Sequence, residues 1–349
     1  MRNFTLKGLF LAVVFMVLGS LSIQAADGDL ITKQITIKLE EAGTLPSKIG
    51  DTKKYKITNL KIMGEINGTD LCFIREMAGS DREGWRTEGK LATLDLSGAK
   101  IVRGGGIYYN SVNCYTSDDV IGNYAFSDCS GLTSLILPSN VTSIGYSAFY
   151  GCIRLTSLTL PSSVTSIGSS AFEACYGLFS LTLPSSVTEI GESAFRGCRS
   201  LASLTLPSSV TEIGESAFEG CIRLASLTLP SSVTSIGKSA FEGCSGLTSI
   251  YVSWESPLSI DASTFKDANT GKCILYVPKG TYDDYWLSNW GIFENIVEYD
   301  ATGIDHITTS GEAKEISRYA ADGQRLEVPA KGLNIVKYSD GCVKKVVVQ

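Results

Sequence analysis

Histidine is the scarcest of the residues that commonly carry chemistry: one histidine, His306, occurs in 349 residues. The usual zinc sites draw on histidine or on C-x-x-C pairs, and a Ser-His-Asp triad needs an imidazole base. The ten cysteines include no C-x-x-C pair. The three glycines at 104–106 are not followed by G-K-[ST], so they do not form a phosphate-binding loop. We therefore expect no enzyme, no metal and no cofactor.

Positive charge is also in deficit. The chain has 30 Lys and Arg against 36 Asp and Glu, a formal charge of −6, and so has no overall attraction for nucleic acid or an anionic membrane. The glutamates recur in register, Glu189 with Glu212 and Glu192 with Glu215, which suits a solvated surface better than a dry acid–base pair. We expect no nucleic-acid partner, and membrane association only through attachment at a cell surface.

An apolar run from Leu9 to Leu21 follows the cations Arg2 and Lys7, and small residues follow at Ala25. This pattern predicts a secretory signal peptide over residues 1–25. A membrane anchor is the alternative, but the run is short and no stop-transfer charges follow it. No cysteine stands at the cleavage site, which argues against a lipoprotein. Cleavage would remove both cations and take the formal charge from −6 to −8.

The centre of the chain is a repeat with a period of 23 residues. Nearly identical copies begin at each of Cys129, Cys152, Cys175, Cys198 and Cys221, and a sixth, from Cys244, soon decays. A fixed period in this range is typical of a solenoid, in which one coil cannot bury its apolar face without a neighbour.

One copy shows how a coil is built. Leu181 and Leu183 have the spacing of one strand face, and Pro184 ends that strand because proline has no N–H to donate. Val187–Ile190 predicts a second, short extended side.

Two further features of the same copy predict its corner. Gly191 is free to take a positive φ where the chain turns again, and residues 193–196 suit a single helical turn that returns the chain to the next cysteine.

The strand motif L-x-S-L-x-L-P, followed by V-T-x-I-G-x-x-A-F-x-G-C, covers about Val120 to Val252. It resembles the 23-residue leucine-rich repeat of the BspA-like bacterial surface proteins. The resemblance implies a strand-rich, α/β-type repeat solenoid with N-terminal and C-terminal caps, which binds rather than catalyses. The implied partners are a host extracellular protein or glycan, or another bacterial surface.

Changes in the pattern predict four parts: a signal peptide at 1–25, an N-terminal cap region at 26–90, the solenoid with its closing cap at 91–298, and a linker with a β-rich tail at 299–349. The cap region is out of register with the repeat. In it, Thr69 and Asp70 stand in N-cap position before an apolar run, Leu71–Met77, that predicts a helix.

An insertion from Gly104 to Asp119 interrupts the first coil and carries Tyr108, Tyr109 and Tyr115. Aromatic residues on a loop can anchor a ligand, but packing of the loop back on the cap is the favoured interpretation.

The solenoid ends in an aromatic cluster on an expected short amphipathic helix, which resembles the closing unit of BspA-like arrays. Its members are Tyr282, Tyr285, Trp286, Trp290 and Phe293. Covering the last coil is the favoured role, and a glycan platform is the alternative.

The tail resembles the C-terminal sorting domain of type IX secretion substrates. The resemblance rests on the turn at Gly323 and Arg325, the strand from Lys331-Gly332, and the terminal strand through Lys344. It implies display on the outer surface of a Gram-negative bacterium.

The six repeated cysteines should form a column with one residue per coil. Neighbours about 4.8 Å apart are close enough for a disulfide, but side chains in a column point the same way. We expect free, buried thiols.

The residues between the strand leucines should face outward and form columns of hydroxyl groups. We predict this face as the ligand-binding surface; its candidate residues are Ser157, Thr159, Ser180, Thr182, Ser203, Thr205, Ser226, Thr228 and Tyr251. The alternative, favoured by the near-identity of the repeats, is a structural surface spacer without a ligand of its own.

Overall fold

The computed structural model describes residues 29–110 and 112–299, together with residues 315–320, 325–326, 328, 332–338 and 343–348. The predicted signal peptide and His306 lie outside the described residues. Within the described part of the chain, no helix is both long and apolar enough to cross a membrane.

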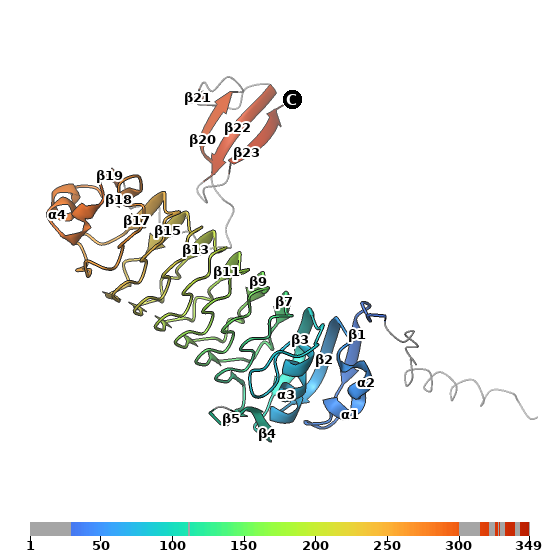
Figure 1. The fold of residues 1–349 in the computed structure, drawn as a ribbon. Coiled ribbons are helices and arrows are strands. Elements are labelled where there is room, and N and C mark those ends of the chain that lie inside the picture. Colours follow the sequence, from blue (N-terminus) through green and yellow to red (C-terminus); the bar gives the residue numbers. More distant parts are fainter. Residues whose placement is uncertain are drawn as a thin grey trace, which may run out of the picture.

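One long parallel sheet runs the length of the array, and each repeat adds one strand to it (Figure 1). Neighbouring strands repeat the same register: Ser134 pairs with Ser157, and Ser157 with Ser180. In sheet order the eleven strands are β1 (Ile35–Lys38), β2 (Asn59–Ile66), β3 (Thr93–Ile101), β7 (Ser134–Ile136), β9 (Ser157–Thr159), β11 (Ser180–Thr182), β13 (Ser203–Thr205), β15 (Ser226–Leu229), β17 (Ser249–Val252), β18 (Ile274–Pro278) and β19 (Asn295–Tyr299).

A second parallel sheet lines the other side of the coils, as the extended pattern at Val187–Ile190 predicts. Its two-residue strands are β6 (Val120–Ile121), β8 (Ser143–Ile144), β10 (Ser166–Ile167), β12 (Glu189–Ile190), β14 (Glu212–Ile213) and β16 (Ser235–Ile236). The strand-rich repeat solenoid predicted from the sequence is thus the observed fold.

The core between the two sheets is a set of columns, each with one residue per coil. The strand leucines, the valine and isoleucine of the second side, and the cysteines are buried, with Cys175 and Leu178 fully inaccessible. The phenylalanines form a continuous stack from Phe126 to Phe265, whose adjacent ring centroids lie 5.0–5.4 Å apart. Because each ring packs on the coil before and the coil after it, burial depends on stacking.

The role predicted for Gly191 is wrong. Gly191 does not have a positive φ. A Cβ built on it would lie 2.7 Å from the carbonyl carbon of Gly168 in the preceding coil, so glycine is required by close approach of two backbones. The positive φ values fall instead on Ser193 (54°) and Gly197 (71°).

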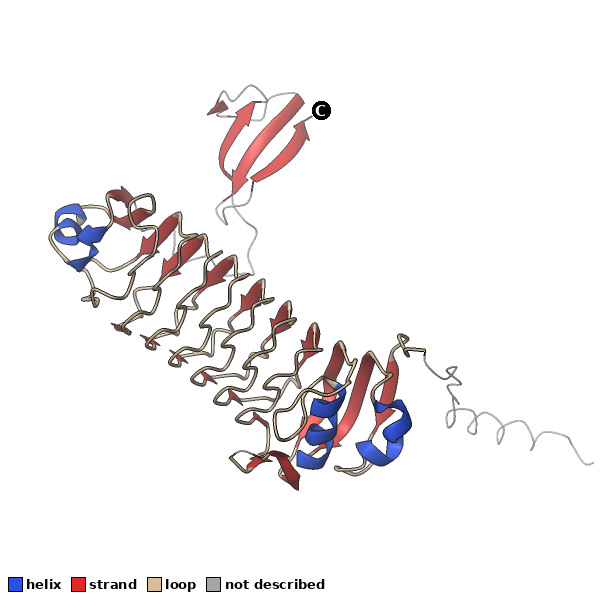
Figure 2. Ribbon diagram, viewed as in Figure 1, coloured by secondary structure: helices blue, strands red, loops and turns tan. Residues whose placement is uncertain are grey.

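A turn closes at 193–196, where the Arg196 N–H donates to the Ser193 carbonyl at 3.0 Å, but it is not the helical turn predicted, because Ser193 has a positive φ. No helix occurs in the described coils from β6 to β17, where Figure 2 shows strands and loops only. The N–H groups of Ser193 and Phe195 donate to Glu215 and Ala217 of the next coil, at 2.8 Å each, rather than back along their own chain. Hydrogen bonds to the next coil therefore alternate with hydrogen bonds inside the turn, such as that from the Ala194 N–H to the Gly191 carbonyl.

At the N-terminal end, α1 (Leu45–Ile49), α2 (Asp51–Lys54) and α3 (Gly68–Met77) pack beside β1 to β3. The helix predicted at Leu71–Met77 begins earlier than expected. Its N-cap is Asn67, not Thr69 or Asp70; the Asn67 side chain accepts from the Thr69 N–H, and the Asp70 carboxylate accepts from the Asn67 N–H. β1 and β2 of the cap region belong to the same sheet as the strands of the repeats. The boundary between cap and solenoid predicted at residue 90 stays a prediction.

The C-terminal end of the array is closed by α4 (Tyr282–Trp286) and the 3₁₀ helix η1 (Asn289–Ile292). Trp290 is fully buried, and its ring centroid lies 5.5 Å from that of Phe265, the last member of the phenylalanine stack. Tyr285 and Phe293 are buried with it, whereas Tyr282 and Trp286 are exposed. Three of the five predicted aromatic residues therefore cover the last coil.

Beyond residue 299, the described strands form a four-stranded antiparallel sheet in the order β21-β20-β22-β23. They are β20 (Glu315–Ala320), β21 (Arg325–Leu326), β22 (Gly332–Tyr338) and β23 (Val343–Val348). This sheet is the all-β tail that the sequence predicts.

Candidate binding surface

The main sheet presents a face of hydroxyl groups, which we call the hydroxyl face. Its Ser column pairs in register from Ser134 to Ser249, and its Thr column includes Thr159 beside Thr182 and Thr205 beside Thr228. Leu158 and its equivalents alternate with these residues and are buried. Side chains repeat about every 4.8 Å along the stack and lie about 6.6 Å apart along a strand, so the face is a regular lattice.

The structure brings all nine predicted candidate residues onto the hydroxyl face. Six are exposed: Ser157, Thr159, Ser180, Thr182, Ser203 and Thr205; Ser226, Thr228 and Tyr251 are partly exposed. Their role in ligand binding stays a prediction.

The hydroxyl face is bounded at both ends by residues of other kinds. Toward the cap, Asp95 pairs in register with Ile136, and its carboxylate forms an ion pair with Lys61, with 2.7 Å between Oδ2 and Nζ. At the far end, the Tyr251 and Tyr276 rings stack with centroids 4.4 Å apart. A ligand that uses only hydroxyl groups therefore meets the central coils.

A second surface lies along the turns between the phenylalanine stack and the main sheet. We call it the variable face, and define it as the residues two before and one after each column cysteine. The first set is Tyr150, Glu173, Arg196, Glu219 and Glu242, preceded by the buried Ser127, and the second is Ser130, Ile153, Tyr176, Arg199, Ile222 and Ser245. Unlike the hydroxyl face, it changes in chemistry from coil to coil.

The variable face is hollowed. One hollow, of about 380 Å³, lies beside the cap, and a second, of about 430 Å³, lies along the next coils; both are lined by Tyr150, Ala174 and Tyr176. A third, of about 400 Å³, shares Arg86 and Ile153 with the first. The first hollow shares lining residues with each of the other two, so the three adjoin along the stack, and we call them together the groove.

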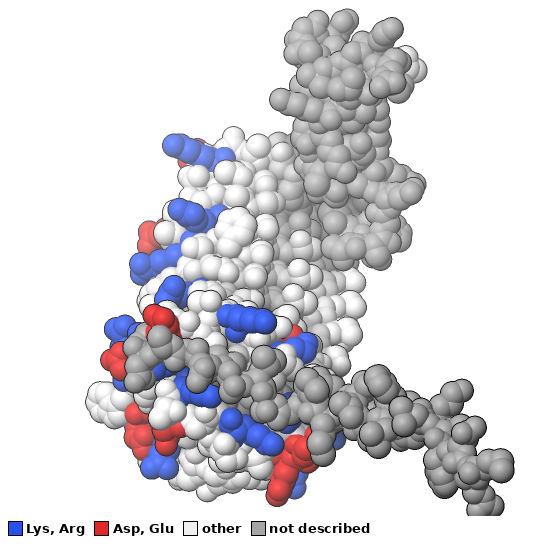
Figure 3. Space-filling model, turned by 90° about the vertical axis from the view of Figure 1, so that its right-hand side faces the viewer, with Lys and Arg blue, Asp and Glu red and all other residues white. Residues whose placement is uncertain are grey.

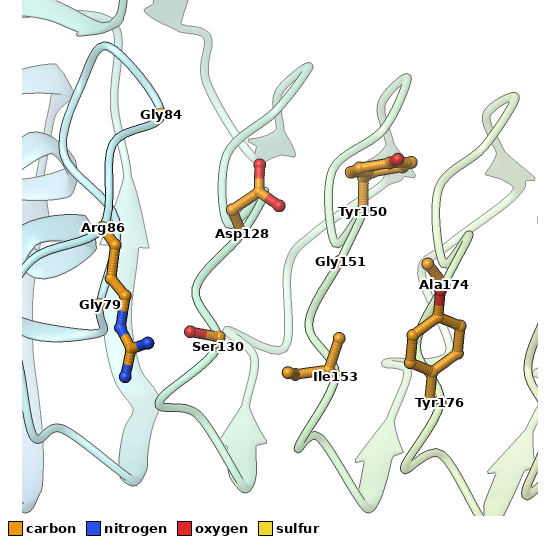
Figure 4. Close-up of a pocket in the computed structure, with 10 residues that line it drawn as sticks. All are labelled: Gly79, Gly84, Arg86, Asp128, Ser130, Tyr150, Gly151, Ile153, Ala174 and Tyr176. Carbon is orange, nitrogen blue, oxygen red and sulfur yellow. The ribbon is translucent and has the colours of Figure 1, made fainter.

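Small residues at the turn form the floor of the groove. The residue directly before each cysteine has a positive φ; it is Asp128 in the first coil and a glycine or alanine from Gly151 onward. Figure 4 shows larger side chains in two rows across successive coils: Arg86, Ser130, Ile153 and Tyr176 in one, and Asp128 and Tyr150 in the other.

Part of the groove's charge is already paired. Arg196 lies 3.2 Å from carboxylate oxygens of both Glu219 and Glu173, and these carboxylates raise the pKa of its guanidinium. The guanidinium carbon of Arg199 lies 4.9 Å from the centroid of the Tyr176 ring, a cation–π contact. In Figure 3, basic and acidic side chains lie together along the left side and over the lower part of the visible surface, and much of the remaining described surface carries no charge.

The six column cysteines are free and fully buried, as predicted. Each thiol from Cys152 to Cys244 donates to the carbonyl of the phenylalanine 26 residues earlier; the Cys175 Sγ lies 3.1 Å from the Phe149 oxygen. Burial raises the pKa of Cys175 to about 12 and that of Cys129 to about 11. These thiols are therefore neutral core groups rather than nucleophiles.

The tyrosine-rich insertion packs back on the cap, as favoured from the sequence: the Gly106 N–H donates to the Thr69 hydroxyl at 3.0 Å. It forms a hairpin of β4 (Gly104–Tyr109) and β5 (Cys114–Thr116). Tyr108 is buried and donates to the Asn123 carbonyl, while the Tyr109 ring stacks on Tyr124 at 4.7 Å. Only Tyr115 of the three predicted tyrosines is exposed.

A buried arginine, which the sequence analysis missed, joins the cap to the first coil. Arg75 of α3 is fully buried and donates to the Tyr124 carbonyl at 2.6 Å and to the Ser80 hydroxyl at 3.0 Å. Its position beside Glu76 within the mostly apolar segment Leu71–Met77 is the signal that could have indicated it.

Glu189 and Glu212 pair in register on the second sheet and are exposed, in agreement with the prediction that they belong to a solvated surface. No group of three or more metal-ligating side chains occurs among the described residues.

Residues 108–201 and 171–281 match the family model described as the BspA type leucine rich repeat region, in six copies. No curated protein matches the chain.

Three solved structures are similar to the chain. A leucine-rich repeat protein of T. pallidum is 31% identical, with 38% of this chain and 66% of that chain covered and a TM-score of 0.32. A leucine-rich repeat protein of Bacteroides ovatus is 18% identical, with 72% and 75% covered and a TM-score of 0.35. The pneumococcal vaccine antigen PcpA is 19% identical, with 76% and 79% covered and a TM-score of 0.35. The described array is thus a leucine-rich repeat solenoid whose repeats, over residues 108–281, match the BspA type.

Proposed function

We propose that this protein is exported, is displayed on the outer surface of a Gram-negative bacterium, and acts there as a binding module rather than an enzyme. Three features support the proposal: the signal-like segment at 1–25, the BspA-type repeats, and the all-β tail, which resembles a type IX sorting domain. The ligand is a host matrix protein, a host glycan or the surface of another cell.

The observation that carries the proposal is the hydroxyl face. Thr159, Thr182 and Thr205 are exposed on strands held in register by two parallel sheets and by the continuous phenylalanine stack. A rigid face loses little conformational entropy when it binds, and each hydroxyl group can donate and accept. Single contacts are weak, but many copies on one cell increase the overall affinity through avidity.

The test is the double variant Thr182→Lys/Thr205→Lys, which puts two long cations at the centre of the hydroxyl face. Both side chains are exposed, so each change should cost no more than about 0.5 kcal/mol of folding free energy. Attachment of protein-coated beads to fixed cells, immobilised matrix proteins and a glycan array should fall while the melting temperature holds.

The matched control is Thr188→Lys/Thr211→Lys, which makes the same change in the same two coils on the side of the second sheet. Thr188 and Thr211 are also exposed, so the control should keep attachment. Equal attachment by both double variants and the unmodified protein would exclude the hydroxyl face as the binding surface.

A second candidate function is a structural spacer, favoured by the uniformity of the Ser column from Ser134 to Ser249. If the array is a spacer, the unmodified protein should attach to none of these surfaces. Shortening the array should then abolish the display of a neighbouring surface component.

A further inference from the structure

Exposed apolar side chains concentrate on the variable face. In the array from Val120 to Val252, seven large apolar side chains are exposed, and four belong to the variable face: Tyr150, Ile153, Tyr176 and Ile222. A fifth, Phe179, directly precedes β11.

The stack does not require apolar residues at these places. The coils that carry Ser130 and Ser245 at the position of Ile153 and Tyr176 fold in the same way, with the same registers on the main sheet. Exposed apolar groups that folding does not require, gathered along one groove, indicate an interaction surface.

The groove also has cations without a carboxylate partner. Within the described residues, Arg86, Arg154 and Arg199 of its lining have no carboxylate within ion-pair distance, whereas Glu173 and Glu219 are both paired with Arg196. Asp128 is the lining carboxylate that has no cation. In a chain of net charge −6, this groove therefore offers an excess of unpaired guanidinium groups.

We propose that the variable face binds an extended acidic segment of a partner polypeptide, with apolar side chains between its carboxylates; this inference rests on the proposed binding function. Tyrosine and arginine are the residues most enriched where interfaces gain their affinity, and arginine holds a carboxylate through two parallel hydrogen bonds. The aliphatic groups of Ile153 and Ile222 favour a polypeptide over an acidic glycan, which has no aliphatic side chain to cover them.

The size of the groove sets the length of the segment. From Ser130 to Ile222 it crosses four coil steps of about 4.8 Å, or roughly 19 Å, which an extended chain covers with about six residues at 3.3 Å each. Arg86 of the cap lines the hollow beyond Ser130 (Figure 4), so we choose an octapeptide, about two residues longer than this span.

The experiment is a fluorescence-anisotropy titration of the purified full chain with a labelled octapeptide in which Glu alternates with Leu and Tyr. The same peptide with Lys for Glu tests the charge, the same peptide with Ser for Leu and Tyr tests the apolar contacts, and a heparin octasaccharide tests an acidic glycan. Saturable binding of the first probe, at least about tenfold tighter than binding of the other three, is the expected result.

The deciding variant is Arg86→Glu/Arg199→Glu. Both side chains are exposed, so the fold should persist, which circular dichroism and melting temperature check. The control, Lys53→Glu/Lys238→Glu, changes the net charge equally at exposed positions outside the groove lining. The groove variant should lose at least about tenfold in affinity for the acidic probe, and the control should keep it.

Equal affinity of both variants, tighter binding of the oligosaccharide, or no binding of the acidic probe would each overturn this inference. The proposed function would still hold after any of these outcomes, provided that beads coated with the unmodified protein attach to the test surfaces and beads coated with the Thr182→Lys/Thr205→Lys variant do not. Conversely, if the unmodified protein attaches to no surface, the proposed function fails whatever the peptide titration shows.

Discussion

Substitution by alanine should lower the stability of the protein far more at one glycine of a coil than at the other. In Gly214→Ala, the new Cβ would lie 2.5 Å from the Glu192 nitrogen and 2.6 Å from the Gly191 carbonyl carbon. Both contacts are about 0.8 Å or more short of an ordinary van der Waals distance, and both partners are backbone atoms, so the two coils must move apart. We expect a loss of about 3 kcal/mol or more in the free energy of unfolding.

Gly220→Ala in the same coil should be mild. Gly220 has φ 71°, and its Cβ would approach no atom closer than 3.8 Å, so the cost is backbone strain alone, about 1 kcal/mol. The chain itself carries alanine at the equivalent position, where Ala174 has φ 59°.

The assay is urea unfolding followed by far-UV circular dichroism, with the midpoint and slope fitted for both variants and the unmodified protein. Gly214→Ala should lower the midpoint at least about three times as far as Gly220→Ala, in the ratio of the two costs. Equal losses, or a larger loss for Gly220→Ala, would refute the conclusion that close backbone approach is what requires glycine at position 214.

Three other predictions concern the thiols and the tail. The six column cysteines should not react with a thiol reagent at pH 8 in the folded protein, and all should react in denaturant, because burial keeps them protonated; three disulfides among them would contradict this. Since burial raises the pKa of Cys129 to about 11 and that of Cys175 to about 12 from an ordinary 9.0, their contribution to stability is complete below pH 9 and is lost as the pH rises through 11 to 12. The urea midpoint should therefore fall between pH 9 and about pH 12, and Cys175→Ala should make this fall smaller. A pH profile of the midpoint that this substitution leaves unchanged would refute the reasoning. Deletion of residues 303–349 should leave the array folded yet prevent surface display in the native host, measured by antibody labelling of intact cells, and normal display would refute the sorting role.

The sequence by itself determined the course of one coil. The 23-residue period, the alternation around Leu181 and the proline after it predicted the main strand, its buried leucines and its outward hydroxyl columns, and the structure has all of these. Alternation of side chains along a strand is a local property of the backbone, so it can be predicted from a single repeat.

The tertiary structure alone decided what each residue meets in the neighbouring coil. The sequence assigned Gly191 to a positive φ, but the stacking distance assigns it to backbone contact with Gly168. It predicted a helical turn before Cys198, where a non-helical turn forms whose N–H groups donate alternately to their own coil and to the next one.

The same reason explains why the groove was not predicted. Tyr150 occupies one position of the repeat and Ile153 and Tyr176 another, in three different coils, and they share one hollow only because the coils stack in register. A periodic sequence specifies the contents of a coil, whereas the pitch and register of stacking, set by packing between coils, specify which side chains become neighbours.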